Sequence, residues 1–174
     1  RSPMAAASAG QTRQEWLGSA FMRLEQDFAP AGVEGAKGQW YIGPGYTERA
    51  PDYWELLGTG KQSASSNSAF GTRSEKTLQL DAGMQAQYDW GGLHLAGFAN
   101  RVRDYILIDG DRTDIRFGKT PLGMMGGALP QVVRNVQSRS LGLEAGVDYR
   151  FSPQWQGEAS LAWVRARNLS DDQA

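Results

Sequence analysis

The sequence predicts an all-β fold, an antiparallel meander of about six long strands that forms a fragment of a transmembrane β-barrel. Three observations support this prediction. Apolar and polar residues alternate strictly over long segments, the connections between segments are short and long in turn, and aromatic residues gather near the segment ends. The 22 glycines among 174 residues also suit a β protein with many turns.

Composition excludes several classes of function. The formal net charge of −1 gives no reason to propose a nucleic-acid partner, because such a surface needs clustered Lys and Arg. The sequence has no cysteine and one histidine, His94, which excludes a Cys/His zinc site, and we expect no bound metal or cofactor. A Ser-His-Asp triad would have to use His94, so we expect no enzyme activity.

Membrane crossing by a helix is not predicted, because no run of about 18 apolar residues exists. A barrel remains compatible with the sequence, since alternating strands leave the hydropathy near that of soluble proteins. We expect no signal peptide at Arg1, and the residues from Asp171 to Ala174 are typical of a loop. The expectation is that residues 1–174 form one partial barrel domain, because about six strands fall short of the minimum of about 8.

Two segments show the alternation most clearly. From Thr77 to Tyr88, and again from Ser140 to Phe151, every second residue is apolar and most residues between them are polar or glycine. Side chains on a strand point to alternate faces, so each segment has one apolar and one polar face. The apolar faces consist of Leu78, Leu80, Ala82, Met84, Ala86 and Tyr88, and of Leu141, Leu143, Ala145, Val147, Tyr149 and Phe151.

Four further segments complete the predicted sheet. Residues from Gln154 to Trp163 alternate in the same way, and the segment from Trp16 to Phe28 does so less regularly. The segment from Trp40 to Thr47 is short and rich in glycine. The segment from Leu93 to Ile108 loses its phase near Asn100–Val102, which a β-bulge would explain.

The connections alternate in length, as they do in outer-membrane barrels, which have short periplasmic turns and long outer loops. Tight turns are expected at Asp89–Gly92 and Ser152–Pro153. Long loops are expected from Glu48 to Ser74 and from Gly110 to Gln131. The connection from Ala29 to Gly38 is longer than a periplasmic turn usually is.

A soluble antiparallel barrel or sandwich, acting as a ligand-binding β domain, is the alternative fold, because it also has one apolar face per strand. The predicted strands run for about 12 residues, whereas strands of soluble proteins usually run for about 5–6. Aromatic residues such as Tyr88, Trp90, Tyr149 and Phe151 also lie at strand ends, where a membrane interface favours them. These features favour the membrane barrel.

Four sequence motifs carry a resemblance to a known family. Arg49-Ala50-Pro51, followed by Glu55-Leu56, resembles the Arg-Ala-Pro…Glu-Leu signature of TonB-dependent receptors, at the junction of a strand and an outer loop. The other three follow in family order, with Ser74 in place of the usual proline. They are Ser74-Glu75-Lys76-Thr77, the run Phe98 to Ile106 with Asp104-Tyr105-Ile106, and Asn135-Val136 before Gly142-Leu143-Glu144.

The resemblance implies more than the residues alone do. It implies a barrel of about 22 strands in the outer membrane of a Gram-negative bacterium, in contact with lipid. It also implies an N-terminal plug domain, absent from this chain, through which the TonB complex acts. The chain is then a wall segment of a transporter, and the Arg49–Leu56 motif is its expected family motif.

Finer similarity points to the copper receptors of this family. Asp52 to Leu56, the stretch Gly123-Met124-Met125-Gly126 and the residues around Asn168 resemble that subfamily, which implies copper as the transported ion. Thioether sulfur is a soft ligand that selects Cu(I), so Met124 and Met125 are candidate substrate contacts. Alternatively, these two residues form an apolar loop tip. A siderophore or other metal chelate is the alternative cargo, and an outer-membrane enzyme the alternative class.

Overall fold

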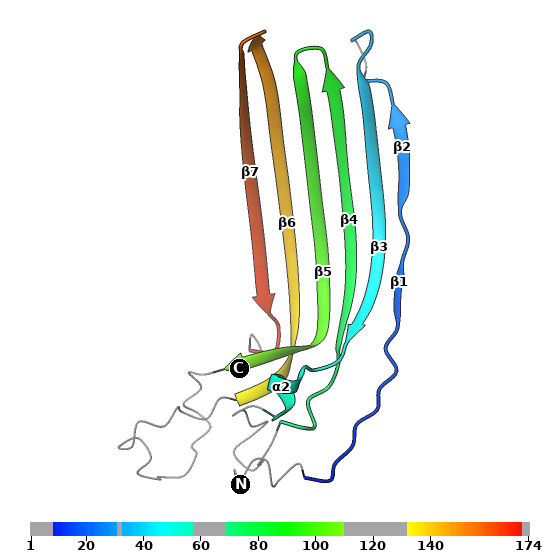
Figure 1. Ribbon diagram of the computed structural model, residues 1–174, viewed down its shortest axis with the longest axis vertical. Coiled ribbons are helices and arrows are strands. Elements are labelled where there is room, and N and C mark those ends of the chain that lie inside the picture. Colours follow the sequence, from blue (N-terminus) through cyan, green and yellow to red (C-terminus); the bar gives the residue numbers. More distant parts are fainter. Residues whose placement is uncertain (1–8, 31–32, 58–68, 110–131, 172–174) are drawn as a thin grey trace, which may run out of the picture. The chain divides into compact units, whose positions relative to one another are not determined.

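The computed structural model describes residues 9–30, 33–57, 69–109 and 132–171 (Figure 1). Strands dominate this part of the chain, and one short helix interrupts them. In chain order the elements are β1 (Ser19–Phe21), β2 (Leu24–Phe28), β3 (Lys37–Arg49), α2 (Tyr53–Leu57), β4 (Glu75–Tyr88), β5 (Gly91–Asp109), β6 (Val132–Ser152) and β7 (Trp155–Asn168).

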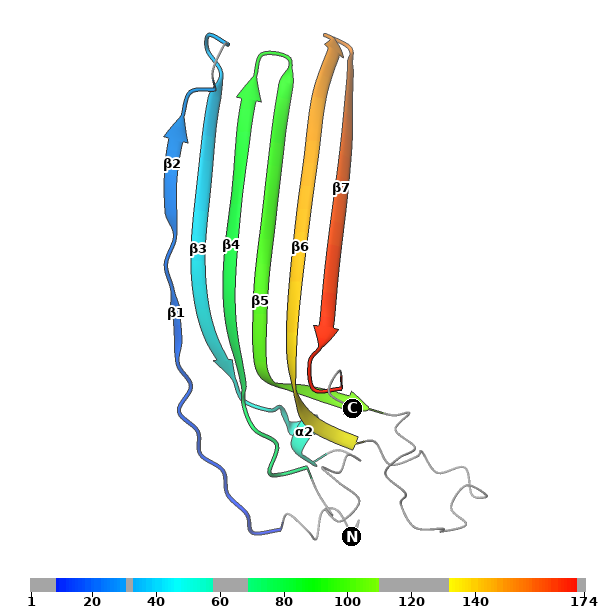
Figure 2. The same cartoon turned by 180° about the vertical axis from the view of Figure 1, so that it is seen from behind.

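The described strands form one sheet, in the order β1-β3-β4-β5-β6-β7, with β2 also paired to β3. β1 and β2 therefore both pair with β3, each later strand pairs with the next in sequence, and Figure 2 shows the same order from behind. Neighbouring strands run in opposite directions, as the arrows in Figure 1 show. The predicted antiparallel meander is confirmed. It has seven strand segments among the described residues, which occupy six positions in the sheet.

The extra segment arises because the predicted strand from Trp16 to Phe28 is interrupted. β1 and β2 pair with β3 in one register, with Phe21 opposite Gly45 and Leu24 opposite Ile42. The gap lies opposite Pro44, which has no N–H to donate to the sheet. The N–H of Met22 still donates to the carbonyl of Pro44 at 3.1 Å. The break therefore reflects one missing donor within a continuous register.

Several predicted boundaries were wrong. β3 and β7 extend past the predicted Trp40–Thr47 and Trp163, and β6 begins at Val132 instead of Ser140. The predicted loop from Glu48 to Ser74 contains the helix α2. The irregularity expected near Asn100–Val102 lies close by, at Asp104, whose φ of 57° is unusual for a residue other than glycine. The predicted loop from Gly110 to Gln131 lies outside the described residues.

The tight turns are where the sequence places them. β4 and β5 are joined through Asp89 and Trp90, and β6 and β7 through Pro153 and Gln154. The connection from β2 to β3 is longer and includes Gly35, whose φ of 82° favours glycine.

The chain divides into two compact units. The loop unit comprises the described residues within Arg1–Gly18, Glu48–Lys76 and Val102–Gln137, and the strand unit those within Ser19–Thr47, Thr77–Arg101 and Ser138–Ala174. The loop unit holds the small apolar core of the described chain, formed by Ala69, Ile106 and Val133. The side chains of Val132 and Val136 are buried in the same unit.

The strand unit has no comparable core among its described residues. Its apolar side chains are instead exposed on one face of the sheet, with Leu78 58%, Leu143 58% and Leu161 74% accessible. A soluble sandwich would bury this face against a second sheet, and the described residues form a single sheet. An uncovered apolar face of this extent marks a surface that meets lipid or another apolar partner.

Aromatic rings form a cluster at the short-turn end of the strand unit. Tyr88 stacks on Trp90 with the ring centroids 4.8 Å apart, and Tyr149 lies 5.4 Å from Trp90 and 4.9 Å from Phe151. Phe151 and Trp155 are 70% and 73% exposed. Amphipathic rings at this position suit the level of lipid headgroups.

The helices of the described residues include none with the length and apolar character needed to span a bilayer.

Substitutions on β6 and β7 can test whether the exposed apolar face meets lipid. Leu143→Lys would place a charge on this face, and we expect it to lower the free energy of unfolding of the full-length protein in lipid vesicles by about 2–4 kcal/mol. Val164 pairs with Gly142 on the opposite face, and Val164→Lys is the matched control with a much smaller effect. Equal losses for the two variants, measured by denaturant titration, would contradict a lipid-facing assignment.

Candidate functional site

The site begins with a reciprocal pair of hydrogen bonds that starts α2. Glu55 N–H donates to Asp52 Oδ1 at 2.8 Å, and Asp52 N–H donates to Glu55 Oε2 at 2.8 Å. This is a capping box, which satisfies backbone donors at a helix start. Pro51, directly before it, is buried. The short helix is therefore fixed by its own first turn.

Arg49, the last residue of β3, connects this helix to the rest of the loop unit. Its Nη1 and Nη2 donate to the two carboxylate oxygens of Glu55 at 3.0 and 2.9 Å. Its Nε donates to Glu75 Oε2 at 2.8 Å. The other oxygen of Glu75 accepts the N–H of Ile106 at 2.8 Å. One guanidinium group thus joins the end of β3, the helix, the start of β4 and, through Glu75, β5.

Glu75 remains charged although its side chain is only 11% exposed. Burial raises the pKa of this carboxyl group, but the hydrogen bonds from Arg49 and from the N–H of Ile106 outweigh burial and hold the pKa below its ordinary value. In return, the hydrogen bonds to Glu75 and Glu55 raise the pKa of the Arg49 guanidinium. The Arg49 cluster, formed by Arg49, Glu55 and Glu75, thus joins two carboxylates to one guanidinium group, and all four carboxylate oxygens accept a hydrogen bond.

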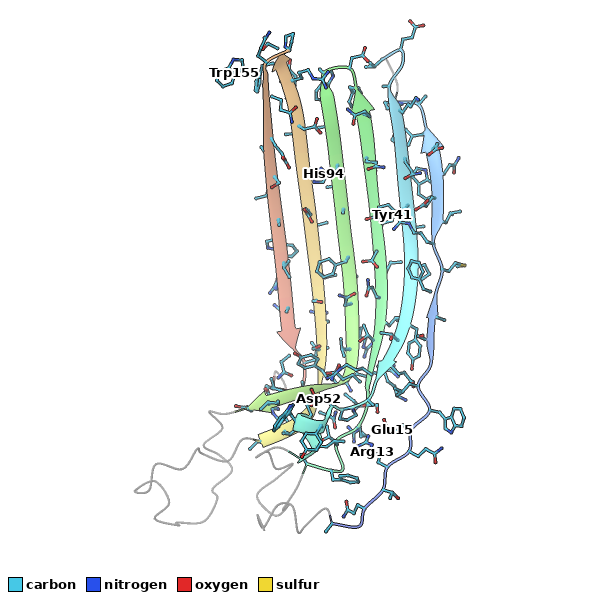
Figure 3. All side chains as sticks on the ribbon, in the orientation of Figure 1. Arg13, Glu15, Tyr41, Asp52, His94 and Trp155 are labelled. Carbon is cyan, nitrogen blue, oxygen red and sulfur yellow. The ribbon has the colours of Figure 1, made fainter. Side chains whose placement is uncertain are left out.

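The N-terminal segment is attached to the same unit by Arg13 and Glu15, which lie side by side in Figure 3 and form an ion pair. Arg13 Nη1 donates to the carbonyl oxygens of Phe70 and Thr72. Glu15 accepts a hydrogen bond from the hydroxyl of Ser74. This hydroxyl is the main cause that lowers the pKa of Glu15. The segment before β1 is therefore held against the chain that precedes β4.

A third cluster joins Arg73, Asp104 and Asn135. The amide of Asn135 accepts the N–H of Arg73 at 2.8 Å and donates to the carbonyls of Arg73 and Asp104 at 2.9 and 2.7 Å. Arg73 Nε and Nη2 both donate to Asp104 Oδ1, at 2.9 and 2.6 Å. Asp104 is the residue with positive φ. The irregular backbone there is thus stabilised from both sides.

These contacts bring the sequence motifs together in space. Arg49 and Glu55 belong to the first motif, Glu75 to the second, Asp104 and Ile106 to the third, and Asn135 to the fourth. Ala50 and Leu56 are half-buried beside the Arg49 cluster, without a polar role in the contacts described. The candidate substrate contacts Met124 and Met125 lie outside the described residues.

Sequence reasoning did not single out Glu75, Arg73, Arg13, Asp104 or Asn135 as site residues. Arg49 and Glu75 could have been proposed as a pair, because residues of opposite charge stand at the two ends of the connection between β3 and β4. The pairing of residues 26 and 62 positions apart, as in Arg49–Glu75 and Arg73–Asn135, is not visible in a single sequence.

The polar face of the strand unit carries rings set over glycines of the next strand. A β-carbon at Gly83 would lie 2.7 Å from the ring of Tyr41, and one at Gly142 or Gly146 would clash with Phe98 or His94. The guanidinium of Arg23 lies 3.9 Å from the centroid of the Tyr41 ring. Figure 3 labels Tyr41 and His94 on this sheet. The only histidine thus has a packing role, against Gly146.

The described residues include no group of three or more His, Cys, Asp or Glu side chains able to hold a metal ion. The clusters of the loop unit pair carboxylates with arginines, which leaves their oxygens occupied. Their arrangement can fix strand ends and loops.

Comparison with known proteins identifies the family. A family model described as TonB dependent receptor-like, beta-barrel matches residues 12–174. The chain therefore belongs to the family of TonB-dependent receptor barrels. Among solved structures it is similar to one titled Copper transporter OprC, with 33% identity and a TM-score of 0.73. That match covers 89% of this chain and 21% of that chain, so the chain spans about a fifth of the transporter. No curated protein matches the sequence.

The Arg49 cluster generates a test of the bidentate link. Arg49→Lys keeps the charge but cannot bind Glu55 through two parallel hydrogen bonds and also reach Glu75. We expect unfolding of the full-length protein to become easier by about 1–2 kcal/mol, since the guanidinium is partly exposed. The rate of hydrogen exchange at the backbone N–H of Ile106 should also increase, because this N–H donates to Glu75, which Arg49 holds in place.

Lys76→Ala is the control for this test, because Lys76 and Glu48 form a looser ion pair of 3.6 Å. Its effect should stay within about 0.5 kcal/mol. If Arg49→Lys changed the free energy of unfolding and the hydrogen exchange of Ile106 as little as Lys76→Ala does, Arg49 would not hold the ends of β3, α2 and β4 together.

Proposed function

We propose that the chain is part of the wall of an outer-membrane transporter of a Gram-negative bacterium, which imports copper with energy delivered by the TonB complex. The family membership supports the class of receptor, and the similarity to a copper transporter at 33% identity supports the cargo. The chain spans about 21% of that transporter, so transport belongs to the full-length protein.

One observation carries the membrane assignment. The strands present a broad apolar face that no described residue covers, and the aromatic cluster of Tyr88, Trp90, Tyr149 and Phe151 stands at one end of it. A β-sheet can meet lipid only if its backbone groups are paired within the sheet and its outward side chains are apolar. Both conditions hold for the central strands β4, β5 and β6.

The proposed orientation places the short turns in the periplasm and the long connections outside the cell. Barrels of this kind have short periplasmic turns and long outer loops. The turns at Asp89–Trp90 and Pro153–Gln154 are short, and the connection that contains α2 is long. The Arg49 cluster would then brace the outer ends of the strands, where water and charge are tolerated.

The polar face of the strand unit would face the barrel interior and a plug domain of the same protein. It carries hydrogen-bonding groups such as Gln39, which contacts Asp27 at 3.2 Å and Gln85 at 3.5 Å. The rings of Tyr41, Phe98 and His94 pack over glycines between these polar groups. Such a surface suits a folded polar partner better than lipid.

Copper is favoured over a siderophore or another metal chelate by the similarity to the copper transporter. Met124 and Met125 remain the proposed substrate contacts of this chain, because thioether sulfur prefers Cu(I) over hard cations. A metal chelate is the second candidate cargo, since receptors with the same barrel motifs carry such compounds. An enzymatic role is not proposed, because the family and the structural relative are receptors and transporters.

Uptake of labelled copper tests this proposal. In copper-starved cells whose only copper receptor is the full-length protein, we expect uptake that requires the protein and TonB and is unchanged by excess ferric siderophore. Replacing both Met124 and Met125 by Ala should lower uptake at limiting copper, whereas Met84→Ala, on the apolar face, should not. Inhibition of copper uptake by a ferric siderophore, or uptake without TonB, would contradict the proposed function.

A further inference from the structure

The apolar face of the strand unit is hollowed near its short-turn end. The hollow has a volume of about 580 Å³ and is lined from β4 to β7, with Phe28 of β2 at one side. Its size falls within the range of about 300–1,000 Å³ that is typical of small-molecule sites. The hollow is therefore of a size that suits a small molecule, whereas a stable protein interface buries about 800 Å² on each partner.

Small side chains between large ones create this hollow. Ala145 of β6 pairs with Leu161 of β7, and Val147 pairs with Ala159, so that a small residue faces a larger one in both pairs. Ala86 on β4 is also small, and only 6% exposed. Three large, exposed leucine side chains line the hollow next to these positions. They are Leu93 and Leu95 of β5 and Leu161 of β7.

The lining chemistry fits a hydrocarbon chain. No charged side chain lines the hollow, and the only residues there with a polar side-chain group are Tyr88, His94 and Ser160. His94 belongs to the polar face, where its ring packs on Gly146. An apolar occupant can therefore fill the hollow without leaving a buried charge unpaired.

The hollow is continuous with the aromatic cluster. Tyr88 lines the hollow and also stacks on Trp90 at 4.8 Å. Tyrosine and tryptophan favour the headgroup level of a bilayer, so a chain in the hollow would have its headgroup beside these rings. With the short turns in the periplasm, this end of the sheet meets the periplasmic leaflet, which is made of phospholipid.

We propose that this hollow is a binding site for one acyl chain of a phospholipid of the periplasmic leaflet, held more tightly than the surrounding lipid. The proposal rests on the membrane orientation of the proposed function. A second copy of the protein and the acyl chains of lipopolysaccharide are the other conceivable occupants, and the experiment distinguishes them.

Native mass spectrometry of the full-length protein, titrated with dioleoyl phosphatidylethanolamine in a mild detergent, tests the site. We expect one phospholipid to bind more tightly than the rest. Ala159→Phe should weaken this first binding step by at least about tenfold, because the ring would fill the hollow. Ala145→Phe provides a second variant from the other strand.

Ala82→Phe is the matched control, because Ala82 is on the same apolar face of β4 and does not line the hollow. It should retain the wild-type affinity. Phospholipid binding that is equal in Ala159→Phe, Ala145→Phe and wild type would overturn the proposal. So would a loss of dimers in these variants with lipid binding unchanged, or tight binding of lipopolysaccharide in place of the phospholipid.

This test is separate from that of the proposed function. Each variant is first checked for insertion into the outer membrane and for copper uptake. If insertion and uptake persist while lipid binding is unaffected by filling the hollow, only the lipid site fails. If the wild-type protein does not insert into the outer membrane, the proposed function itself fails.

Discussion

The structure depends on one constraint, which is that a strand in contact with lipid must satisfy its backbone hydrogen bonds within the sheet. The order β1-β3-β4-β5-β6-β7 meets this by pairing β1 and β2 with β3 and each later strand with the next one in sequence. The alternation of side chains then separates an apolar from a polar face along every strand. The interruption opposite Pro44 costs one ladder hydrogen bond and leaves the register of β1 and β2 intact. The apolar face that we propose meets lipid and the opposite polar face both follow from that arrangement.

The loop unit is stabilised by a different set of interactions. It has a small apolar core of Ala69, Ile106 and Val133, and its strand ends are joined by charged and amide side chains. Burying Glu75 is unfavourable alone, and Arg49 with the N–H of Ile106 offsets that cost. Such clusters suit a region that faces water. They explain why conspicuous sequence motifs stand at the junctions of strands and loops, although none of these residues has a chemical task in transport that the contacts reveal.

The sequence predicted the fold well where alternation was regular, as in β4, where the expected Thr77–Tyr88 became Glu75–Tyr88. It failed where burial overrode the alternation. Val132 and Val133 are adjacent and both buried, so the first part of β6 lacks a period of two. The helix α2 is too short for a helical period, although Asp52 and Glu55 have capping-box spacing. Contacts such as Arg73–Asn135 depend on strand order, which local patterns do not contain.

The most direct test of the account concerns the two ends of β7. Single cysteines are placed by Gln154→Cys in the short turn and Ser170→Cys beyond the other end, in a full-length protein whose cysteines outside this chain have been replaced by serine, because this chain itself contains none. A maleimide that does not cross membranes should label the cysteine at position 170 in intact cells. It should label the one at 154 only after the outer membrane is opened. Labelling of both positions in intact cells, or the reverse order, would contradict a wall strand that spans the membrane in the proposed orientation.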